Sequence, residues 1–245
     1  MSSRTAGLEL ATASRGRDRI LFDPERVTDP TARLFDPSQW MAQEKVVATY
    51  HGRGPTYVLA AGEVEWVLRH LRRGGFPARL VEDRYLWVGE ARSRPFRELR
   101  ILAHLAREGF PVPHPVAAGV WRHGLMYDGD IITTRVPGEP LSLNLREDRP
   151  SPRAWRGIGK TLRRFHERGV YHADLSAGNV LVGAEGVFLI DFDRARIRKR
   201  GRWMQRNLDR LERSARKLAG AERWAAPRWQ ACWSALWTGY KSWNG

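Results

Sequence analysis

The segment from Tyr171 to Arg194, YHADLSAGNVLVGAEGVFLIDFDR, brings acid and amide side chains close together in the sequence. Asp174 follows a histidine by two positions, Asn179 follows Asp174 by five, and Asp191 ends the apolar run VFLI. Carboxylates can accept a proton or bind a metal ion, and an amide oxygen can help to complete a magnesium site. These residue types in this order predict phosphoryl transfer from a metal-bound nucleotide to a hydroxyl group.

The three side chains have separate roles in this chemistry, and their spacing is that of a kinase catalytic loop followed by a metal-binding loop. Asp174 would accept the proton of the acceptor hydroxyl. Asn179 would bind Mg²⁺ through its amide oxygen, and Asp191 would bind the ion between the β- and γ-phosphates of ATP. A single Asp or Asn is usually a turn residue. The complete order, bracketed by two strand-like runs, favours the catalytic interpretation.

Two features earlier in the chain could hold the nucleotide. Gly52 and Gly54 lie in a turn between two strand-like runs, and this turn either covers phosphates or is an ordinary hairpin turn. Arg69 ends the next apolar strand, where protein kinases carry a lysine that grips the phosphates. A guanidinium can bind phosphates with two hydrogen bonds, so Arg69 is the candidate cation, with Arg72 and Arg73 as alternatives.

A helix is predicted between Pro95 and Gly109, because apolar residues recur there at intervals of three and four. Glu98 lies near its start. In a kinase, the corresponding glutamate pairs with the strand cation and holds it against the phosphates. The alternative is a solvated glutamate that pairs with arginines of the same helix.

Aromatic residues mark two further helices in the second half of the chain. Ser151 and Pro152 form a strong helix start, a capping hydroxyl followed by proline at the first helical position. Near the C-terminus, aromatic residues recur at intervals of four and three, as expected for one helical face: Trp229, Trp233, Trp237 and Tyr240. We expect this face to pack in the core, and contact with a membrane interface is the alternative.

Composition favours an anionic partner. Lys and Arg outnumber Asp and Glu by 42 to 27, which gives a formal net charge of +15. A basic run from Arg194 to Arg202 follows Asp191 closely, so we interpret it as a surface for an anionic acceptor or for anionic lipid. The single cysteine, Cys232, excludes an internal disulfide and a cysteine-based metal site. No apolar stretch has the length of a signal peptide or a spanning helix, so we expect no membrane crossing.

These observations together predict an α+β, protein-kinase-like bilobal fold. Residues 1–19 are expected to be a flexible basic arm without regular structure. Residues 20–136 are expected to form an N-lobe with an antiparallel sheet and one helix. Residues 137–245 are expected to form a mainly helical C-lobe that carries the catalytic and metal loops.

From about Tyr50 to Lys217, the chain resembles the lipopolysaccharide kinases, a protein-kinase-like family. The resemblance rests on the segments GRG at 52–54, VLRHLRRGG at 67–75, DRYLW at 83–87, FPVPHPVAAGV at 110–120, FHERGVYHADLSAGNVL at 165–181, LIDFDRAR at 189–196 and WxxxNLxRL at 203–211. It implies ATP-dependent phosphorylation of the first Kdo (3-deoxy-D-manno-octulosonic acid) sugar on lipid A precursor, at the 4-hydroxyl, with Asp174 as the catalytic residue. It also implies a peripheral location on the cytoplasmic face of the bacterial inner membrane.

Other functions remain open at this point. A heptose kinase of the lipopolysaccharide core, or another small-molecule phosphotransferase, would need the same catalytic residues. A pseudokinase that binds nucleic acid or lipid would suit the charge, but the complete set Asp174, Asn179 and Asp191 argues against it. No A-P-E segment follows Asp191, so a protein substrate is not expected. We also expect no nucleic acid and no obligate protein partner.

Overall fold

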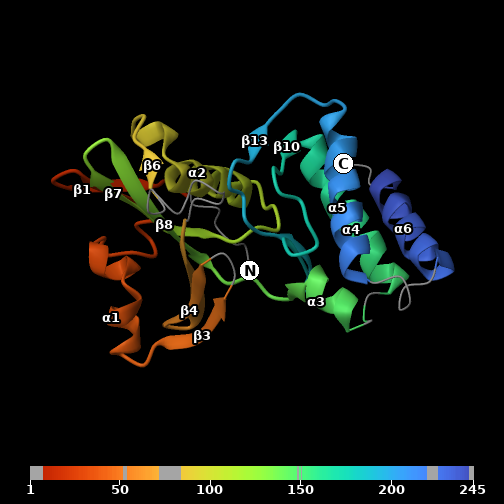
Figure 1. Cartoon of the computed structure of the whole chain (residues 1–245), viewed down its shortest axis with the longest axis horizontal. Coiled ribbons are helices and arrows are strands. Elements are labelled where there is room, and N and C mark those ends of the chain that lie inside the picture. Colours follow the sequence, from red (N-terminus) through yellow and green to blue (C-terminus); the bar gives the residue numbers. More distant parts are fainter. Residues whose placement is uncertain are drawn as a thin grey trace, which may run out of the picture. The chain divides into compact units, whose positions relative to one another are not determined.

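A computed structural model describes residues 8–51, 54–71, 84–147, 149, 151–219 and 226–242 of the chain (Figure 1). The chain divides into two compact units, one of residues 1–109 and 113–135, the other of residues 110–112 and 136–245. The first unit contains an antiparallel sheet, and the second contains mainly helices. The predicted α+β fold class is confirmed.

The sheet of the first unit has the strand order β1-β2-β7-β8-β5-β4-β3, and β6 pairs with β8. Every pairing in it is antiparallel. The strands are β1 (Ala11–Arg15), β2 (Asp18–Phe22), β3 (Val46–His51), β4 (Pro55–Ala61), β5 (Val64–His70), β6 (Tyr85–Leu86), β7 (Pro115–His123) and β8 (Met126–Thr134). The short helices η1 (Ala32–Phe35), α1 (Pro37–Met41) and η3 (Glu90–Arg92) connect them.

The start of the chain corrects one prediction. We expected no regular structure before residue 20, but residues 11–15 and 18–22 form a hairpin whose turn contains Gly16 at φ 60°. The second strand of this hairpin pairs with β7, from Arg19 opposite Val120 to Phe22 opposite Ala117. The pairing of β2 with β7 and the burial of Ile20 and Leu21 therefore anchor residues 11–19, which have little apolar character of their own. Residues 1–7 lie outside the described part.

The two faces of the sheet are covered differently. Trp66 and Leu68 of β5 lie in a core cluster with Ile20, Phe35 and Leu59, among others. Arg69 points to the opposite face, because successive strand residues alternate. There it meets α2 (Arg94–Arg107), whose apolar residues are buried at Phe96, Leu99, Leu102 and Leu105. This predicted helix is confirmed.

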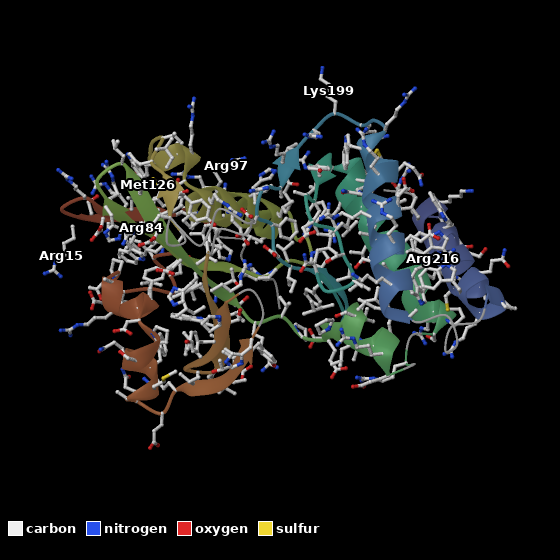
Figure 2. All side chains as sticks on the ribbon, viewed as in Figure 1. Arg15, Arg84, Arg97, Met126, Lys199 and Arg216 are labelled. Carbon is white, nitrogen blue, oxygen red and sulfur yellow. The ribbon has the colours of Figure 1, made fainter. Side chains whose placement is uncertain are left out.

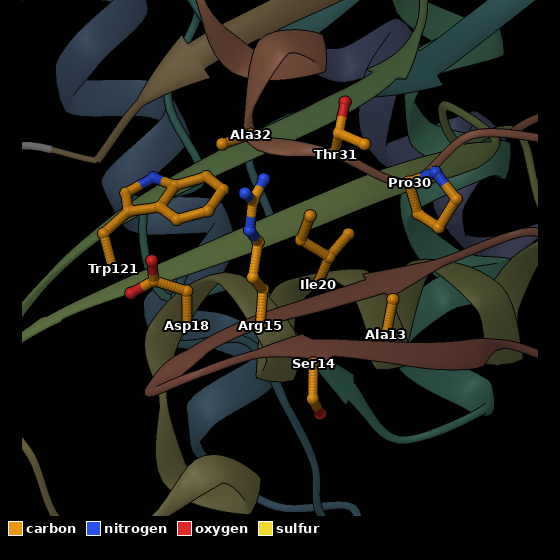
Figure 3. Close-up of a pocket in the computed structure, with 9 residues that line it drawn as sticks. All are labelled: Ala13, Ser14, Arg15, Asp18, Ile20, Pro30, Thr31, Ala32 and Trp121. Carbon is orange, nitrogen blue, oxygen red and sulfur yellow. The ribbon is translucent and has the colours of Figure 1, made fainter.

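A small pocket of about 80 Å³ lies beside the β1–β2 hairpin (Figure 3). It is lined by Arg15, Asp18, Ile20 and Trp121, together with small residues of β1 and of the segment around Thr31. Ligand sites usually enclose at least about 300 Å³, so this pocket is too small for a nucleotide. None of the predicted site residues lines it.

The second unit contains α3 (Leu141–Arg146), α4 (Pro152–Glu167), α5 (Trp203–Ala219) and α6 (Ala226–Lys241). Its short strands are β9 (Glu139–Pro140), β10 (Val170–Tyr171), β11 (Val180–Gly183), β12 (Gly186–Leu189) and β13 (Arg196–Ile197). The predicted start of α4 is confirmed, because the amide of Ala154 donates to Ser151 Oγ at 3.3 Å. Among the described helices, none is both long enough and apolar enough to cross a membrane.

The aromatic face of α6 packs on α4. Trp229 lies 5.7 Å from Trp155 between ring centroids, and Trp229 and Tyr240 are both buried. His166 Nδ1 is 2.8 Å from the hydroxyl of Tyr240, and burial lowers the pKa of His166 to about 4. The structure therefore supports core packing, the favoured interpretation of this face.

The helices α4 and α6 approach closely at two glycines. A Cβ on Gly159 would lie 2.8 Å from the backbone nitrogen of Tyr240, and a Cβ on Gly239 would lie 3.0 Å from the Cα of Arg156. Real Cβ atoms essentially never come within 3.0 Å of a neighbouring heavy atom. Only glycine at these two positions allows the helices to pack this tightly.

Candidate active site

A β-hairpin positions the two predicted metal ligands. Strands β11 and β12 pair from Val180 opposite Leu189 to Gly183 opposite Gly186, as the two apolar runs predicted. Asn179 precedes the first strand, and the amide of Ile190 donates to the Asn179 carbonyl at 3.1 Å. Asp191 follows directly. The open end of this hairpin thus brings Asn179 and Asp191 together.

The predicted catalytic loop, residues 172–178, orients the side chain of Asn179. Its Nδ2 donates to the backbone carbonyl of Asp174 at 2.9 Å. This bond uses the amide nitrogen and leaves the orientation of Oδ1 defined, which is the atom that a hard cation would bind. The contact also ties the predicted metal ligand to the predicted base.

Asp191 has an unusual backbone conformation for a residue other than glycine, with φ at 63°. Such a conformation costs on the order of 1 kcal/mol and persists where the surrounding structure enforces it. Here Asp191 lies between the hairpin and Phe192, a buried side chain that stacks on Phe165 at 6.0 Å. The flanking strand and the anchored ring together hold the carboxylate at the end of the hairpin.

His172 links the catalytic loop to the metal loop. Its Nδ1 accepts from the amide of Asp174 at 3.3 Å, and its Nε2 lies 3.0 Å from the carbonyl of Ile190. These two contacts require a neutral ring with the proton on Nε2. Burial lowers the pKa of His172, which agrees with a neutral ring. His172 therefore has a structural role, because its ring connects the backbone at Asp174 to the backbone at Ile190. The sequence motif did not reveal this role.

One face of α5 holds the catalytic loop at three points. Asn207 binds both backbone groups of His172: its Nδ2 donates to the carbonyl at 2.9 Å, and its Oδ1 accepts from the amide at 3.3 Å. Arg210 donates to Asp174 Oδ1 at 2.5 Å. Ser214 Oγ accepts from the amide of Ala177 at 3.1 Å. Positions 207, 210 and 214 share a helical face, so a single helix fixes the whole loop.

In the first unit, the predicted pairing of Arg69 and Glu98 is present. Arg69 Nη2 lies 2.5 Å from Glu98 Oε1, and the Glu98 side chain is 1% exposed. Gly54 lies in the β3–β4 turn, directly before β4. Gly52 and the alternative cations Arg72 and Arg73 lie outside the described residues. The geometry supports Arg69 as the partner of Glu98 and excludes the alternative of a solvated Glu98.

The basic run after Asp191 is largely solvent-exposed. Residues 196–202 are all exposed, and Lys199 extends away from the ribbon (Figure 2). Two of its arginines have local partners: Arg198 lies over the ring of Tyr171 at 4.3 Å, and Arg200 pairs with Glu167. The others present their charge to solvent.

The donor set at the hairpin suits Mg²⁺. Asn179 and Asp191 offer oxygen atoms, which this hard cation prefers, and Mg²⁺ commonly takes one or two protein ligands with phosphates and water. Among the described residues, no cluster of three or more His, Cys, Asp or Glu side chains could hold a metal ion alone. A site completed by nucleotide phosphates fits these residues better than an all-protein cage.

Three of the residues that shape this site were not assigned roles from the sequence: His172, Asn207 and Ser214. Asn207 and Arg210 both belong to the WxxxNLxRL segment that carries the family resemblance, and that segment names no role for either of them. The spacing of Asn207 and Arg210 on one helical face was the available signal. It could not name their targets, which lie about 35 residues earlier in the chain.

The chain is similar to known proteins over most of its length. The model of the lipopolysaccharide kinase (Kdo/WaaP) family matches residues 38–240. The 3-deoxy-D-manno-octulosonic acid kinase of Xanthomonas campestris (strain B100) is 40% identical over 208 residues, 84% of this chain and 83% of that protein. The protein of the same name from Vibrio vulnificus (strain CMCP6) is 38% identical over 204 residues, 82% and 86% of the two chains.

Among solved structures, the bifunctional kinase-methyltransferase WbdD is similar, with a TM-score of 0.45 and 17% identity. The aligned region covers 76% of this chain and 42% of the WbdD chain.

Proposed function

The chain belongs to the lipopolysaccharide kinase (Kdo/WaaP) family, and we propose that it phosphorylates the 4-hydroxyl of the Kdo sugar on Kdo-lipid A precursor, with ATP as donor. The observation that carries this proposal is the identity of 38–40% to proteins named 3-deoxy-D-manno-octulosonic acid kinase, over more than four fifths of the chain. The structure also supports a phosphotransferase, because hydrogen bonds bring together a candidate base, Asp174, and two candidate metal ligands, Asn179 and Asp191.

In the proposed reaction, Asp174 accepts the proton of the acceptor hydroxyl. The oxygen of that hydroxyl forms a bond to the γ-phosphorus of ATP as the bond to the β,γ-bridging oxygen breaks, and ADP leaves. His172, Asn207 and Arg210 hold Asp174 in place for this step. A rigidly held base is needed because misplacement by about 1 Å can cost 100-fold in rate.

Asn179 and Asp191 would hold Mg²⁺, which, when bound, neutralises charge on the phosphates. In the first unit, Arg69 would grip the phosphates while Glu98 fixes its direction, and the turn that contains Gly52 and Gly54 would contribute backbone amides. The burial of Glu98 supports this role, because a carboxylate is rarely buried without a cation to pair with.

We further propose that the protein binds the cytoplasmic face of the inner membrane peripherally. The support is the exposed basic segment from Arg194 to Arg202, since each basic side chain near an anionic surface contributes on the order of 1 kcal/mol. The aromatic face of α6 does not contribute, because it packs on α4. Replacement of Arg196, Lys199 and Arg202 with glutamine is expected to weaken co-sedimentation with anionic vesicles by roughly fivefold per charge.

A matched control for that experiment is the replacement of Arg153, Arg156 and Lys160, three exposed residues of α4, with glutamine. It removes the same charge from the same unit. Equal weakening by both triple variants would show a general charge effect and contradict a membrane face at residues 194–202.

The acceptor is tested by mass spectrometry. Lipid A precursor, Kdo-lipid A precursor and heptose-bearing core are incubated separately with the protein, ATP and Mg²⁺. The expected result is a gain of one phosphoryl group on the Kdo-bearing acceptor alone. A gain on heptose-bearing core, with none on Kdo-lipid A precursor, would instead support the heptose kinase.

A further inference from the structure

The catalytic candidate Asp174 is paired with Arg210 of α5, whose guanidinium can do more than hold the base in place. Arg210 donates to Asp174 Oδ1 at 2.5 Å, and the two side chains are 49% and 37% exposed. Nearby acids on α5 have other partners: Asp209 accepts from Gln205, and Glu212 binds Arg216. In the described part of the chain, Asp174 is the acid with which Arg210 pairs.

Stability does not explain this pair. An ion pair with this much exposure contributes only about 0–1 kcal/mol. The catalytic loop is already attached to α5 on both sides of Asp174, by Asn207 at His172 and by Ser214 at Ala177. The loop would therefore keep its position without Arg210. The charge of Arg210 therefore serves the Asp174 carboxylate itself and any anionic group that binds beside it.

The chemistry of a guanidinium indicates which kind of group would bind beside Asp174. Its five N–H donors lie in one plane, and the bond to Asp174 uses one of its edges. Another edge can bind a second carboxylate with two parallel hydrogen bonds. Because half of the Arg210 side chain is exposed, an acceptor whose hydroxyl reaches Asp174 would also meet this edge. An acidic group close to the reacting hydroxyl would fit there.

We propose that Arg210 binds the carboxylate of the acceptor sugar and thereby selects an acidic sugar over a neutral one. The inference rests on the proposed function, since an octulosonic acid carries such a carboxylate and a heptose does not. In this arrangement Arg210 bridges the base and the acceptor: it orients the carboxylate of Asp174 and fixes the sugar so that the hydroxyl faces the base. Arg210 is a specificity-determining residue that also positions Asp174.

The test compares two acceptors: Kdo-lipid A precursor, and the same molecule with the Kdo carboxylate converted to its methyl ester. The parent protein is expected to prefer the acid form by roughly 10- to 100-fold in kcat/KM, the effect of one charge-assisted bidentate contact. Arg210→Gln should remove most of this preference by raising the KM for the acid form, while the KM for ATP stays unchanged. Arg210→Lys, which keeps the charge but not the planar fork, should retain part of it.

Arg213→Gln is the matched control. Arg213 is exposed, lies one turn further along α5, and loses the same charge on substitution. It should keep the parent preference for the acid acceptor. A variant with the parent melting temperature shows that the fold is retained, so that changes in KM report on the site.

Four outcomes separate the possibilities. Loss of the acid preference in Arg210→Gln, and not in Arg213→Gln, supports the inference. An equal fall in kcat for both acceptors, with an unchanged ratio, would overturn it and leave Arg210 a positioning residue alone. A parent protein that phosphorylates both forms equally well would overturn it without any variant. A parent protein that phosphorylates neither overturns the proposed function and this inference with it.

Discussion

Two arginine–carboxylate pairs of the same length, 2.5 Å, have very different surroundings. Arg69–Glu98 links β5 to α2, and the carboxylate is 1% exposed. Arg210–Asp174 links α5 to the catalytic loop, and both partners are more than a third exposed. Burial makes the first pair a structural element whose acid cannot meet a substrate. Exposure makes the second pair available to one. Exposure therefore distinguishes the pair that a substrate could contact, and distance does not.

The largest expected effect is on the acid of the exposed pair. Asp174→Asn keeps the shape of the side chain but removes the proton acceptor, so we expect kcat to fall by at least 10²- to 10⁴-fold. Steady-state kinetics at saturating ATP would measure it. Parent turnover in a variant that melts normally would place the base elsewhere and break the comparison.

The buried pair should affect stability most. Glu98→Ala leaves the guanidinium of Arg69 without this acid in a largely buried position, and we expect a loss of about 3 kcal/mol in the free energy of unfolding. Urea denaturation followed by circular dichroism would measure the loss. A change below about 1 kcal/mol would mean that Arg69 turns to solvent and that the pair is not structural.

The proposed metal ligand next to the exposed pair, Asn179, is expected to give an intermediate effect. Asn179→Ala removes one oxygen ligand and the bond from Asn179 Nδ2 to the Asp174 carbonyl. We expect the Mg²⁺ concentration for half-maximal activity to rise roughly tenfold, in the range found when the groups supporting a metal site are removed. Titration of activity against Mg²⁺ for parent and variant decides this. If the curves of this variant and of Asp191→Ala both superimpose on the curve of the parent protein, the metal binds elsewhere.

The smallest effect is predicted for the stability of the exposed pair. Arg210→Gln should change the free energy of unfolding by no more than about 1 kcal/mol, because a half-exposed pair is screened by water. The same urea experiment serves for this variant and for Glu98→Ala. Comparable losses in both would remove the distinction between the two pairs.

Local order in the sequence explains what could be predicted. Asp174, Asn179 and Asp191 lie within one short stretch, so their spacing alone indicated the hairpin and the loop that hold them. The start of α4 was equally visible, because a capping serine and the following proline act on the first turn of their own helix. In both cases the interacting atoms are near neighbours in the chain.

Distant contacts explain what could not be predicted. The β1–β2 hairpin depends on β7, about a hundred residues later, and residues 11–15 show no strong strand pattern of their own. Asn207 and Arg210 reach a loop that precedes them by about 35 residues. A spacing of three puts two residues on one face of a helix, but no rule of local structure names the group that such a face will meet.

The tight glycine crossing between α4 and α6 makes the end of the chain necessary for a site that contains none of its residues. A protein truncated before α6 would keep Asp174, Asn179 and Asp191. Trp155 and His166 of α4 would, however, lose their contacts with Trp229 and Tyr240 and become exposed to solvent. Phe165, which directly precedes His166 in α4, stacks on Phe192, and the ring of Phe192 lies 5.0 Å from that of His172. A loss of order in α4 would thus disturb the catalytic loop through the contacts of Phe165 with Phe192 and of Phe192 with His172. A stop codon before Ala226, which removes all of α6, is expected to inactivate the enzyme as completely as one in the catalytic motif.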